Sequence, residues 1–532
     1  MALIERTPAQ TVAAALATRA TTDPERVFLR GADRPLGYGE VDSRAESLAA
    51  ALAHLGVEEG DRVALLLPAC PEFVTTLFAV AKLGAVAVPL NPRLTTSDLH
   101  YMLRHSEAVC VVTVERSYGI EYLEVFEDLL VSLPDLQYLV TVGDEDLWYD
   151  DRIFQFEDLL SAGAGRDYPA PDVDPASDCF AIVYTSGTTG KPKGVELSHA
   201  NLVATAAASA EALGLTPDDT VVGISSLFHV FALVQGLLGT LWGGASLVLQ
   251  DEAEAGPTLD LIEAHRATVH FGVPTLFVQS AAEQEGSPRD LSSLRLAVVA
   301  GAPVNDELVT RLRSTLCPDV RIAYSLTEAS STVCVPGAAD AEQKKAYTVG
   351  RPLRGTELRI LEEDGSLLPE ESVGEIALKG PGVMLGYYRQ PRETREAFDA
   401  NGFLRTGDLG MVDEGGYVHL VGRRKDVIIR SGFNVYPREV ESRLEAHPAV
   451  QEAVIVGMPD PLLGEAICAC IVPIEGAIVT DPELVDWCRE TLAESKVPDQ
   501  VRFFDSFPRT GTGKTRRVEL ARLIQSEGAD PA

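Results

Sequence analysis

Short apolar runs alternate with longer amphipathic stretches over the first two thirds of the chain. The run from Val63 to Leu67 predicts a buried strand, and a helical stretch extends from Pro71 to about Leu83. Further apolar runs cover residues 85–89, 109–114, 179–184, 220–224, 245–249, 269–271 and 296–299. Strands that alternate with helices are typical of βα units, so we expect an α/β fold with parallel-rich sheets.

The pattern changes after about residue 345. Segments 358–361, 374–378 and 416–420 are short and punctuated by Gly and Pro, which predicts a small antiparallel subdomain. Beyond it, helical segments at 437–446 and 481–492 are mixed with strand-like segments at 450–456 and 468–472. We therefore expect a large N-terminal domain, residues 1–424, whose part 345–424 is the small β subdomain. Residues 425–532 form a small α+β C-terminal domain in this prediction.

The start of the chain favours a helix over a targeting signal. Glu5 and Arg6 precede only a short apolar stretch, which is not typical of a signal peptide. Thr7, Pro8 and Gln10 fit a capping box with proline at the first helical position. No segment reaches about 18 consecutive apolar residues, so we expect no membrane span and a cytoplasmic protein.

Composition and charge narrow the class of partner. The chain of 532 residues is 46% hydrophobic and 23% charged, as is ordinary for a soluble enzyme. Its formal net charge is −34, with 79 acidic against 45 basic residues. Such a field repels nucleic acid and anionic membranes, so neither is expected as a partner. An anionic substrate must therefore meet local basic groups.

The eight cysteines and nine histidines do not predict a metal site. No Cys-x-x-Cys pair is present, and the histidines form no metal-ligand spacing with the cysteines. Cys468 and Cys470 alternate across Ala469, as two residues on one face of a strand would. We expect buried thiols in a reducing compartment.

The segment from Tyr184 to Gly194 has the chemistry that a triphosphate needs. It follows an apolar run and holds three glycines, four hydroxyls and two lysines. Glycines let backbone N–H groups turn toward an anion, and the lysines supply charge. Composition alone fits a plain surface loop equally well, but the order of the residues closely resembles the signature loop of the adenylate-forming superfamily. The residues that this resemblance implies for phosphate binding are Thr185, Ser186, Gly187, Thr188, Thr189, Gly190, Lys191 and Lys193.

A P-loop ATPase is the rival interpretation. Gly513, Lys514 and Thr515 supply the end of a Walker A motif, but the required first glycine would fall on Pro508. The site also lies too near the C-terminus for the α/β domain that follows a true P-loop. The sequence therefore favours the adenylate-forming interpretation.

The resemblance recurs in the order of that superfamily over residues 35–520. Gly301, Ala302 and Pro303 resemble the turn that lines the adenine, and residues 324–328 resemble Tyr-Gly-x-Thr-Glu. The resemblance implies that Tyr324 lies near the base, Thr327 bonds the α-phosphate and Glu328 holds Mg²⁺. Ser325 stands where the family has glycine at the floor of the acyl pocket. An added hydroxymethyl group either shortens the pocket or bonds a polar substituent, and the sequence does not decide between them.

Three later motifs complete the implied nucleotide site. Asp408, in Thr-Gly-Asp, and Arg423, in Gly-Arg-x-Lys-Asp, would bind the ribose. Lys425 falls at the position of the hinge about which a mobile C-terminal domain pivots in the family. Lys514, in the closing motif, would be the catalytic lysine that stabilises charge during adenylation. The catalytic candidates are Lys514, Glu328, Thr327 and His229.

The implied acyl pocket carries no aspartate near residues 225–233, where amino-acid-activating relatives hold an ammonium group. We therefore expect a fatty or aromatic acid rather than an amino acid. The pocket residues in this prediction are His229, Phe231, Val273, Gly301, Ser325 and Val333. A lone His among apolar residues is more often part of a core, but its motif position favours the pocket.

The resemblance implies an acyl-CoA synthetase that uses ATP, Mg²⁺ and CoA. The carboxylate would form an acyl-adenylate with loss of pyrophosphate, and CoA would then take the acyl group near Ser431 and Gly432. Three alternatives stay open: loading of a free carrier protein, a luciferase-like oxidation, and a degenerate relative that only binds nucleotide. A homodimer is also left open.

Overall fold

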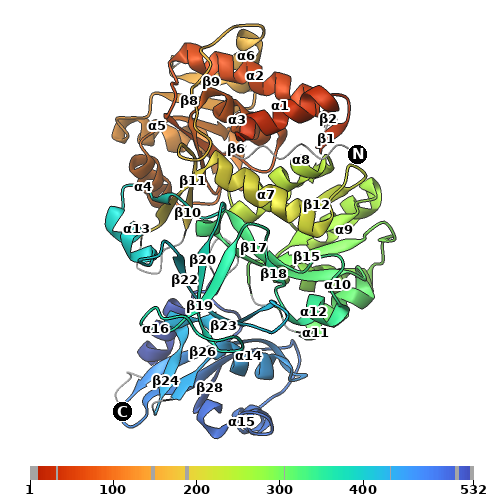
Figure 1. Ribbon diagram of the computed structural model, residues 1–532, viewed down its shortest axis with the longest axis vertical. Coiled ribbons are helices and arrows are strands. Elements are labelled where there is room, and N and C mark those ends of the chain that lie inside the picture. Colours follow the sequence, from red (N-terminus) through yellow and green to blue (C-terminus); the bar gives the residue numbers. More distant parts are fainter. Residues whose placement is uncertain are drawn as a thin grey trace. The chain divides into compact units, whose positions relative to one another are not determined.

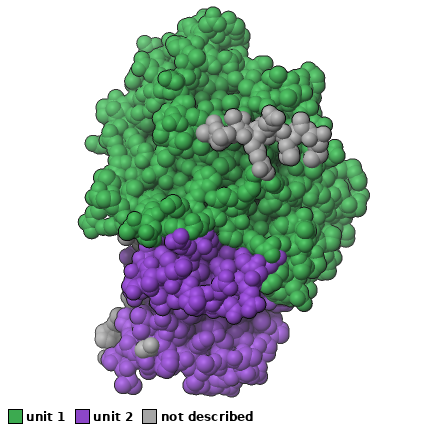
Figure 2. Space-filling view, in the orientation of Figure 1, with its two compact units in different colours: residues 1–304, 309–357, 379–404 green, residues 305–308, 358–378, 405–532 purple. Residues whose placement is uncertain are grey.

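The computed structural model describes residues 10–31, 34–144, 150–185, 191–302, 304, 306–431, 433–509 and 515–527. The chain divides into two compact units (Figure 2). Unit 1 comprises residues 1–304, 309–357 and 379–404, and unit 2 comprises residues 305–308, 358–378 and 405–532. The predicted domain boundary at residue 424 and the predicted hinge at Lys425 fall inside unit 2, and both remain predictions.

Over the described residues, unit 1 contains a nine-stranded sheet in the order β18-β17-β16-β15-β14-β12-β13-β1-β2 (Figure 1). Its centre, from β16 to β1, is parallel, whereas β2, β17 and β18 run antiparallel at the edges. Its strands are β1 (Val27–Arg30), β2 (Pro35–Gly37), β12 (Thr220–Ile224), β13 (Ser246–Leu249), β14 (Val269–Gly272), β15 (Leu296–Ala300), β16 (Val320–Leu326), β17 (Ser331–Val335) and β18 (Arg351–Pro352).

A second sheet of unit 1 has the order β21-β11-β10-β4-β3-β5-β8-β9, counted over the described part of the chain. The strands β10, β4, β3, β5, β8 and β9 are parallel, and the β10–β11 hairpin followed by β21 forms the antiparallel edge. The strands are β3 (Arg62–Leu66), β4 (Val86–Pro89), β5 (Ala108–Val114), β8 (Tyr138–Val142), β9 (Ile153–Gln155), β10 (Cys179–Thr185), β11 (Lys193–Ser198) and β21 (Gly386–Tyr387). The short strands β6 (Arg116–Ser117) and β7 (Ile120–Glu121) pair with each other.

Helices cover both sheets, as parallel strands buried on both faces require. Helix α3 begins at Pro71, and ten of its side chains are buried, so it is a core helix. The helices of unit 1 are α1 (Val12–Thr22), α2 (Tyr38–Leu55), α3 (Pro71–Leu83), α4 (Thr96–Ser106), α5 (Tyr122–Ser132), α6 (Phe156–Gly163), α7 (His199–Leu213), the π-helix η1 (Phe231–Leu238), α8 (Gly239–Gly243), α9 (Ala255–His265), α10 (Pro274–Gly286), η2 (Thr327–Ala329), α12 (Glu342–Tyr347) and α13 (Pro391–Ala397); α11 (Asp306–Thr315) has residues in both units.

Unit 2 carries two sheets among its described residues. A four-stranded sheet has the order β19-β20-β22-β23, and a five-stranded sheet joins β25, β24, β27 and β26, with β28 beside β27. The strands are β19 (Glu357–Leu361), β20 (Gly374–Lys379), β22 (Leu404–Val412), β23 (Val418–Arg423), β24 (Ile428–Arg430), β25 (Phe433–Val435), β26 (Val450–Asp460), β27 (Gly464–Pro473) and β28 (Gln500–Phe503). The helical segments are η3 (Arg424–Asp426), α14 (Pro437–Glu445), α15 (Asp481–Arg489), η4 (Glu494–Lys496) and α16 (Arg517–Glu527).

The five-stranded sheet buries a different core on each face. On one face Ile455 and Ile467 pack with Leu484 of α15, and on the other face Cys468 and Cys470 pack with Leu520 of α16. The two cysteines therefore share one face of β27, as their alternation predicted. All eight cysteines are free thiols.

The predicted fold class is confirmed: the chain combines parallel-rich sheets and helices with an antiparallel subdomain and an α+β C-terminal region. Helix α1 begins at Val12, and the Thr11 side chain caps it by accepting the Ala14 N–H at 3.1 Å. The predicted capping box at Thr7 and Pro8 lies outside the described residues. No helix among the described residues is long and apolar enough to cross a membrane.

Candidate active site

The β10–β11 hairpin of unit 1 carries the two ends of the predicted phosphate loop. Its antiparallel register pairs Tyr184 with Gly194 and Thr185 with Lys193, so these residues meet at the end of the hairpin. The apolar residues of β10 are buried in the sheet, which fixes the point from which the loop departs. The half-buried Thr185 is the last described residue before that loop.

Both lysines of the predicted loop lie over aromatic rings of unit 1. The Lys191 Nζ atom is 5.2 Å from the centroid of the Tyr101 ring, and Tyr101 donates its hydroxyl to the carbonyl oxygen of Pro192 at 3.2 Å. The Lys193 Nζ atom is 4.5 Å from the centroid of the Tyr387 ring. An ammonium over an aromatic face is attracted by the ring quadrupole. Each ring therefore favours one position of the lysine ammonium group and leaves its charge intact.

The neighbouring parallel strands β15 and β16 deliver the predicted adenine residues to one edge of the nine-stranded sheet. Ala300, the last residue of β15, pairs with Ala323, so Gly301 follows the end of β15 and Tyr324 lies beside it in β16. Ligands of open α/β sheets bind at this edge. Gly301 has φ +93°, a backbone conformation that side chains disfavour, which explains glycine at the turn. Tyr324 is buried, at 5% exposure.

Glu328 is held in place from two sides. It lies in the single 3₁₀ turn η2, and its carbonyl oxygen accepts the Met384 N–H at 2.9 Å. Its side-chain Oε1 accepts a hydrogen bond from the Tyr387 hydroxyl at 3.0 Å. Burial raises the pKa of Tyr387, and the adjacent Glu328 carboxylate adds to the effect, so the phenol stays a donor.

The surroundings of Glu328 fit a magnesium ion that arrives with triphosphate. In the described part of the chain, no group of three or more His, Cys, Asp or Glu side chains is placed to hold a metal ion. Mg²⁺ is commonly held by one or two carboxylates together with water and substrate phosphates. The half-buried Glu328 carboxylate, which accepts a hydrogen bond from the neutral Tyr387 hydroxyl, suits that role.

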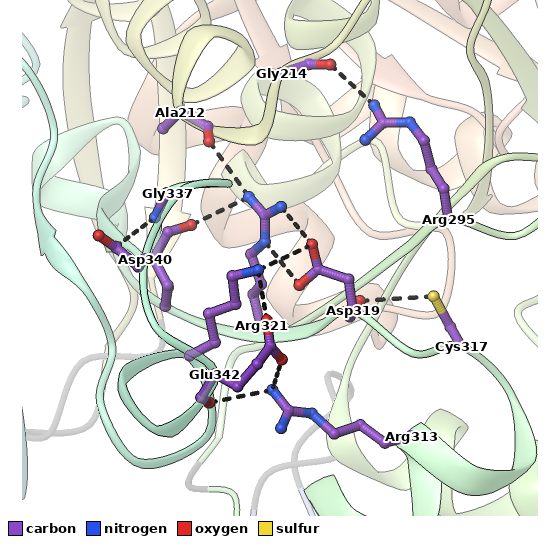
Figure 3. Close-up of polar contacts among 12 residues, drawn as sticks. Ala212, Gly214, Arg295, Arg313, Cys317, Asp319, Arg321, Gly337, Asp340 and Glu342 are labelled. Atoms are coloured by element: carbon purple, nitrogen blue, oxygen red, sulfur yellow. Dashed lines mark hydrogen bonds and ion pairs between the residues drawn. The ribbon is translucent and has the colours of Figure 1, made fainter.

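The opposite end of β16 is anchored by buried charges (Figure 3). Arg321, 1% exposed, donates to both oxygens of Asp319 at 3.1 and 2.6 Å. Its other nitrogen donates to the carbonyl oxygens of Ala212 and Pro336 at 3.3 and 3.2 Å. Lys345 lies 3.5 Å from the same aspartate. The strand that carries Tyr324 is therefore fixed to α7 and to the segment after β17.

The predicted acyl pocket borders a π-helix, a form that occurs often at functional sites. Phe231 begins the π-helix η1, and its N–H donates to Nδ1 of His229 at 3.2 Å. The Phe231 ring meets the Phe271 ring of β14 edge to face, with centroids 5.9 Å apart. His229 and Phe231 are therefore brought together with an aromatic partner that the sequence analysis did not include.

Of the remaining predicted pocket residues, Val273 and Gly301 lie close to each other, and Ser325 and Val333 lie on the neighbouring strands β16 and β17. Val273 is 38% exposed, and a Cβ atom added at Gly301 would lie 3.5 Å from its Cγ1 atom. Ser325 pairs with Thr332 in the β16–β17 ladder, and the next residue, Val333, is 2% exposed. Because η1 packs against β17, the aromatic and strand residues belong to one region of unit 1.

In unit 2, the two predicted ribose residues contact each other. Asp408 and Arg423 are paired across the β22–β23 hairpin, and Arg423 Nε lies 3.1 Å from Asp408 Oδ1. The Asp408 side chain is 10% exposed, whereas that of Arg423 is 50% exposed. The Asp408 N–H donates to Thr406 Oγ1 at 3.1 Å, and that hydroxyl donates to the Ile376 carbonyl at 2.7 Å.

Lys425, the predicted hinge residue, lies in the 3₁₀ turn η3 directly after β23. Burial lowers the pKa of its ammonium below the ordinary value, and the nearby Arg423 acts in the same direction. Asp426, the next residue, lies 3.8 Å from Arg517 at the start of α16. Arg517 also pairs with Glu441, which is 2% exposed, at 2.7 Å. The turn is thus tied to α14 and α16 of the same unit.

Glu452 of β26 contacts Arg509, which lies within the closing motif, and Thr515, which follows it. Its carboxylate pairs with Arg509 at 2.5 Å and accepts the Thr515 hydroxyl at 3.3 Å. Arg509 and Thr515 also form an antiparallel β-bridge. In the same unit, Ser431 has φ +51° and donates its N–H to the Leu463 carbonyl at 2.7 Å.

Several predicted residues lie outside the described part of the chain. They are Ser186, Gly187, Thr188, Thr189, Gly190, Pro303, Gly432 and Lys514. Their assigned roles remain predictions.

Comparison with known proteins assigns the chain to a family. A profile described as AMP-binding enzyme matches residues 16–388, and one described as AMP-binding enzyme C-terminal domain matches residues 439–514. The chain belongs to the AMP-binding enzyme family. The resemblance to acyl-CoA synthetases of the adenylate-forming superfamily is thereby confirmed, and so is the interpretation as a ligase.

Relatives of this family match along nearly the full chain. The feruloyl-CoA synthase of Amycolatopsis sp is 36% identical over 95% of this chain and 97% of its own. The putative acyl-CoA synthetase YngI of Bacillus subtilis (strain 168) is 33% identical over 96% of both chains. The crystal structure of the anthranilate CoA ligase AuaEII with anthranoyl-AMP superposes over 100% of both chains, with a TM-score of 0.90 and 28% identity.

Sequence reasoning missed Tyr387 and Glu452. Tyr387 belongs to a two-residue strand that pairs with β11, far away in the sequence. Glu452 lies in a strand and gives no motif signal. The one available signal was the pair of adjacent tyrosines, Tyr387 and Tyr388, after an apolar turn.

Proposed function

We propose that the protein activates an apolar fatty or aromatic carboxylic acid with ATP and transfers the acyl group to CoA. The observation that carries this proposal is the meeting of Lys193 and Glu328 at Tyr387. It brings a phosphate-loop cation and a magnesium-type carboxylate together in unit 1. The family and its CoA-ligase relatives support both steps.

In the first step, a carboxylate oxygen of the acid attacks the α-phosphorus of ATP. The bond from that phosphorus to the bridging oxygen breaks, and pyrophosphate leaves with the electron pair. Lys191, Lys193 and the loop hydroxyls bind the departing phosphates, and Thr327 donates to the α-phosphate. Glu328 would hold Mg²⁺, which would supply charge neutralisation at the phosphates. Lys514 stabilises the charge that gathers between the two anions.

Four further groups orient the nucleotide in this proposal. Tyr324 and the Gly301 turn contact the base, while Asp408 accepts from the ribose hydroxyls and Arg423 assists. Asp408 and Arg423 pair with each other in this structure, so the two side chains proposed to bind the ribose lie side by side.

In the second step, the CoA thiol attacks the acyl carbonyl. The bond from that carbon to the AMP oxygen breaks, AMP leaves, and the thiol gives up its proton. We propose that a turn of the C-terminal domain about Lys425 brings Ser431 and Gly432 to the thiol. The left-handed φ of Ser431 supports a close backbone approach at this point.

The class of acid follows from the pocket. The edge-to-face pair of Phe231 and Phe271 offers aromatic surface, and Val273 and Val333 add aliphatic surface. Such walls suit an apolar acyl group and give no partner to an ammonium group. A feruloyl-CoA synthase and an anthranilate CoA ligase among the similar proteins support an aromatic acid within this class.

The eight free thiols support a cytoplasmic location.

The test is pyrophosphate release across short, medium, long and aromatic acids, with CoA present and absent. We expect release that depends on an apolar acid, and AMP and acyl-CoA in equal amounts when CoA is added. Adenylate that forms but turns over only with a holo-carrier protein would favour the carrier-loading alternative. Nucleotide binding with no release for any acid would contradict both enzymatic proposals.

A further inference from the structure

We propose that Tyr387 is a positioning residue for adenylation, which sets the Glu328 carboxylate toward the metal and the Lys193 ammonium toward the triphosphate. The hydroxyl of Tyr387 contacts Glu328 at 3.0 Å, and its ring lies 4.5 Å from Lys193 Nζ. One neutral side chain therefore touches two groups of opposite charge that the proposed function places on the same ligand. The proposal rests on that function and adds a residue to it.

The backbone gives Tyr387 little freedom to move. It lies in β21, directly opposite Val195 in the antiparallel pairing with β11, so its side chain reaches the diagonal neighbour Lys193. The Tyr387 N–H donates to Thr394 Oγ1 at 2.9 Å. A Cβ atom at the preceding Gly386 would lie 2.9 Å from Thr394 Cγ2, so α13 packs closely against this turn.

The hydroxyl contact orients a metal-type ligand. Hydrogen bonds from outer residues fix the direction in which a carboxylate presents its lone pairs, and losing one commonly weakens metal binding by about 10- to 100-fold. The bond to Oε1 sets the rotation of the Glu328 carboxylate, while the Met384 N–H fixes its backbone. Together they leave the carboxylate few alternative directions.

The ring contact acts on the other charge. An ammonium over a tyrosine face is attracted only weakly at a partly exposed site, so the ring biases the position of the Lys193 ammonium without binding it tightly. A carboxylate partner in the same place would hold the lysine more strongly and cancel its charge. Tyrosine is the residue type that can orient both Lys193 and Glu328 and neutralise neither.

Tyr387→Phe is the decisive variant, because it removes the hydroxyl and keeps the ring. Tyr388→Phe is the matched control: its hydroxyl contacts Glu107 at 3.4 Å, away from Glu328. The primary readout is binding of Mn²⁺ to each protein in the presence of α,β-methylene-ATP, followed by electron paramagnetic resonance. We expect the Mn²⁺ dissociation constant to rise about tenfold in Tyr387→Phe and to stay unchanged in Tyr388→Phe.

Two further readouts separate positioning from a general structural role. The apparent KM for Mg²⁺ in pyrophosphate release should rise in Tyr387→Phe with a smaller change in kcat, and thioester formation from supplied acyl-AMP should be preserved. Tyr387→Leu, which also removes the ring, should in addition weaken binding of the ATP analogue without metal.

The outcomes distinguish this inference from the proposed function. Equal Mn²⁺ affinity in wild type and Tyr387→Phe overturns the role of Tyr387, whereas a wild-type protein that releases no pyrophosphate overturns the function itself. If Tyr387→Phe does not fold, 3-fluorotyrosine at position 387 keeps the hydroxyl and gives a ¹⁹F signal. That signal should shift when Mg²⁺ is added to the analogue complex, and an unchanged signal overturns the proposal.

Discussion

Glu328 of unit 1 and Asp408 of unit 2 are both carboxylates with a proposed role in ATP binding, but they have different partners. Glu328 accepts from the neutral Tyr387, while Asp408 pairs with the cation Arg423. A neutral partner leaves the full charge of Glu328 for a divalent ion. A cationic partner offsets the charge of Asp408 and suits it to uncharged ribose hydroxyls. The partner of a carboxylate in the site therefore indicates which kind of ligand that carboxylate binds.

The largest expected effect concerns the one catalytic cation assigned to unit 2. Lys514→Ala should lower the rate of adenylation from acid and ATP by about 10²- to 10³-fold, because a donor to the developing charge is lost. Thioester formation from supplied acyl-AMP should largely survive. Single-turnover assays of both half-reactions, with Lys496→Ala of the same unit as control, check this. Equal loss in both half-reactions would remove the assigned role.

Acid should destabilise unit 1 before it destabilises unit 2. Burial lowers the pKa of both His199 and His270 of unit 1 to about 4 from an ordinary 6.5. The unfolded chain therefore takes up protons first, and each histidine removes up to about 3 kcal/mol of stability as the pH falls from 6.5 to about 4. In unit 2, His419 and His447 lie 3.2 and 3.8 Å from carboxylates.

Amide hydrogen exchange on each side of that pH window measures this difference. Strands β12 and β14 should lose protection on acidification before β26 and β27 do. His199→Gln should reduce the acid sensitivity of unit 1, whereas His419→Gln should leave it unchanged. Protection that disappears in both units at the same pH would contradict the assignment of the acid sensitivity to the two buried histidines.

Asp408→Asn tests the ribose half of the comparison. Loss of a charged acceptor commonly costs about 1.5–3 kcal/mol, so kcat/KM for ATP should fall roughly 10- to 100-fold. The preference for ATP over 2′-deoxy-ATP should shrink in the same variant. Steady-state kinetics with both nucleotides check this, with the exposed Glu414→Gln of the same hairpin as control. A full preference retained in Asp408→Asn would show that the carboxylate does not bind the ribose.

The smallest expected effect concerns the acid. Ser325→Gly removes a hydroxymethyl group beside the β16–β17 ladder, and a change of this size in a pocket alters discrimination by about tenfold. The ratio of kcat/KM between a bulky and a short acid should rise if Ser325 shortens the pocket. An unchanged acid profile would mean that this position does not select the substrate.

Local patterns predicted the buried elements well. The limits of α3 and β12 match the predicted segments residue for residue, because an apolar run ended by Pro, Gly or a polar turn leaves little choice. The structure caps α1 with Thr11, which the sequence analysis did not single out, and the predicted capping box at Thr7 and Pro8 lies outside the described residues.

Site residues were predictable only where they belong to a contiguous sequence motif. Glu328, Asp408 and Arg423 were found in this way, and the pairing of the last two could be inferred only from the hairpin register. Tyr387 escaped because its partners come from β11 and η2, far apart in the sequence. Contacts between distant segments depend on the fold, and no local pattern records them.

The most direct test of the proposed acyl-adenylate intermediate traces one oxygen atom of the carboxylic acid. An apolar acid labelled with ¹⁸O in both carboxylate positions is incubated with ATP, Mg²⁺ and CoA, and the AMP is analysed by mass spectrometry. If the carboxylate attacks the α-phosphorus, each AMP carries one ¹⁸O atom and the pyrophosphate carries none. Acyl-CoA formed with unlabelled AMP, or with ¹⁸O in phosphate, would contradict an acyl-adenylate intermediate.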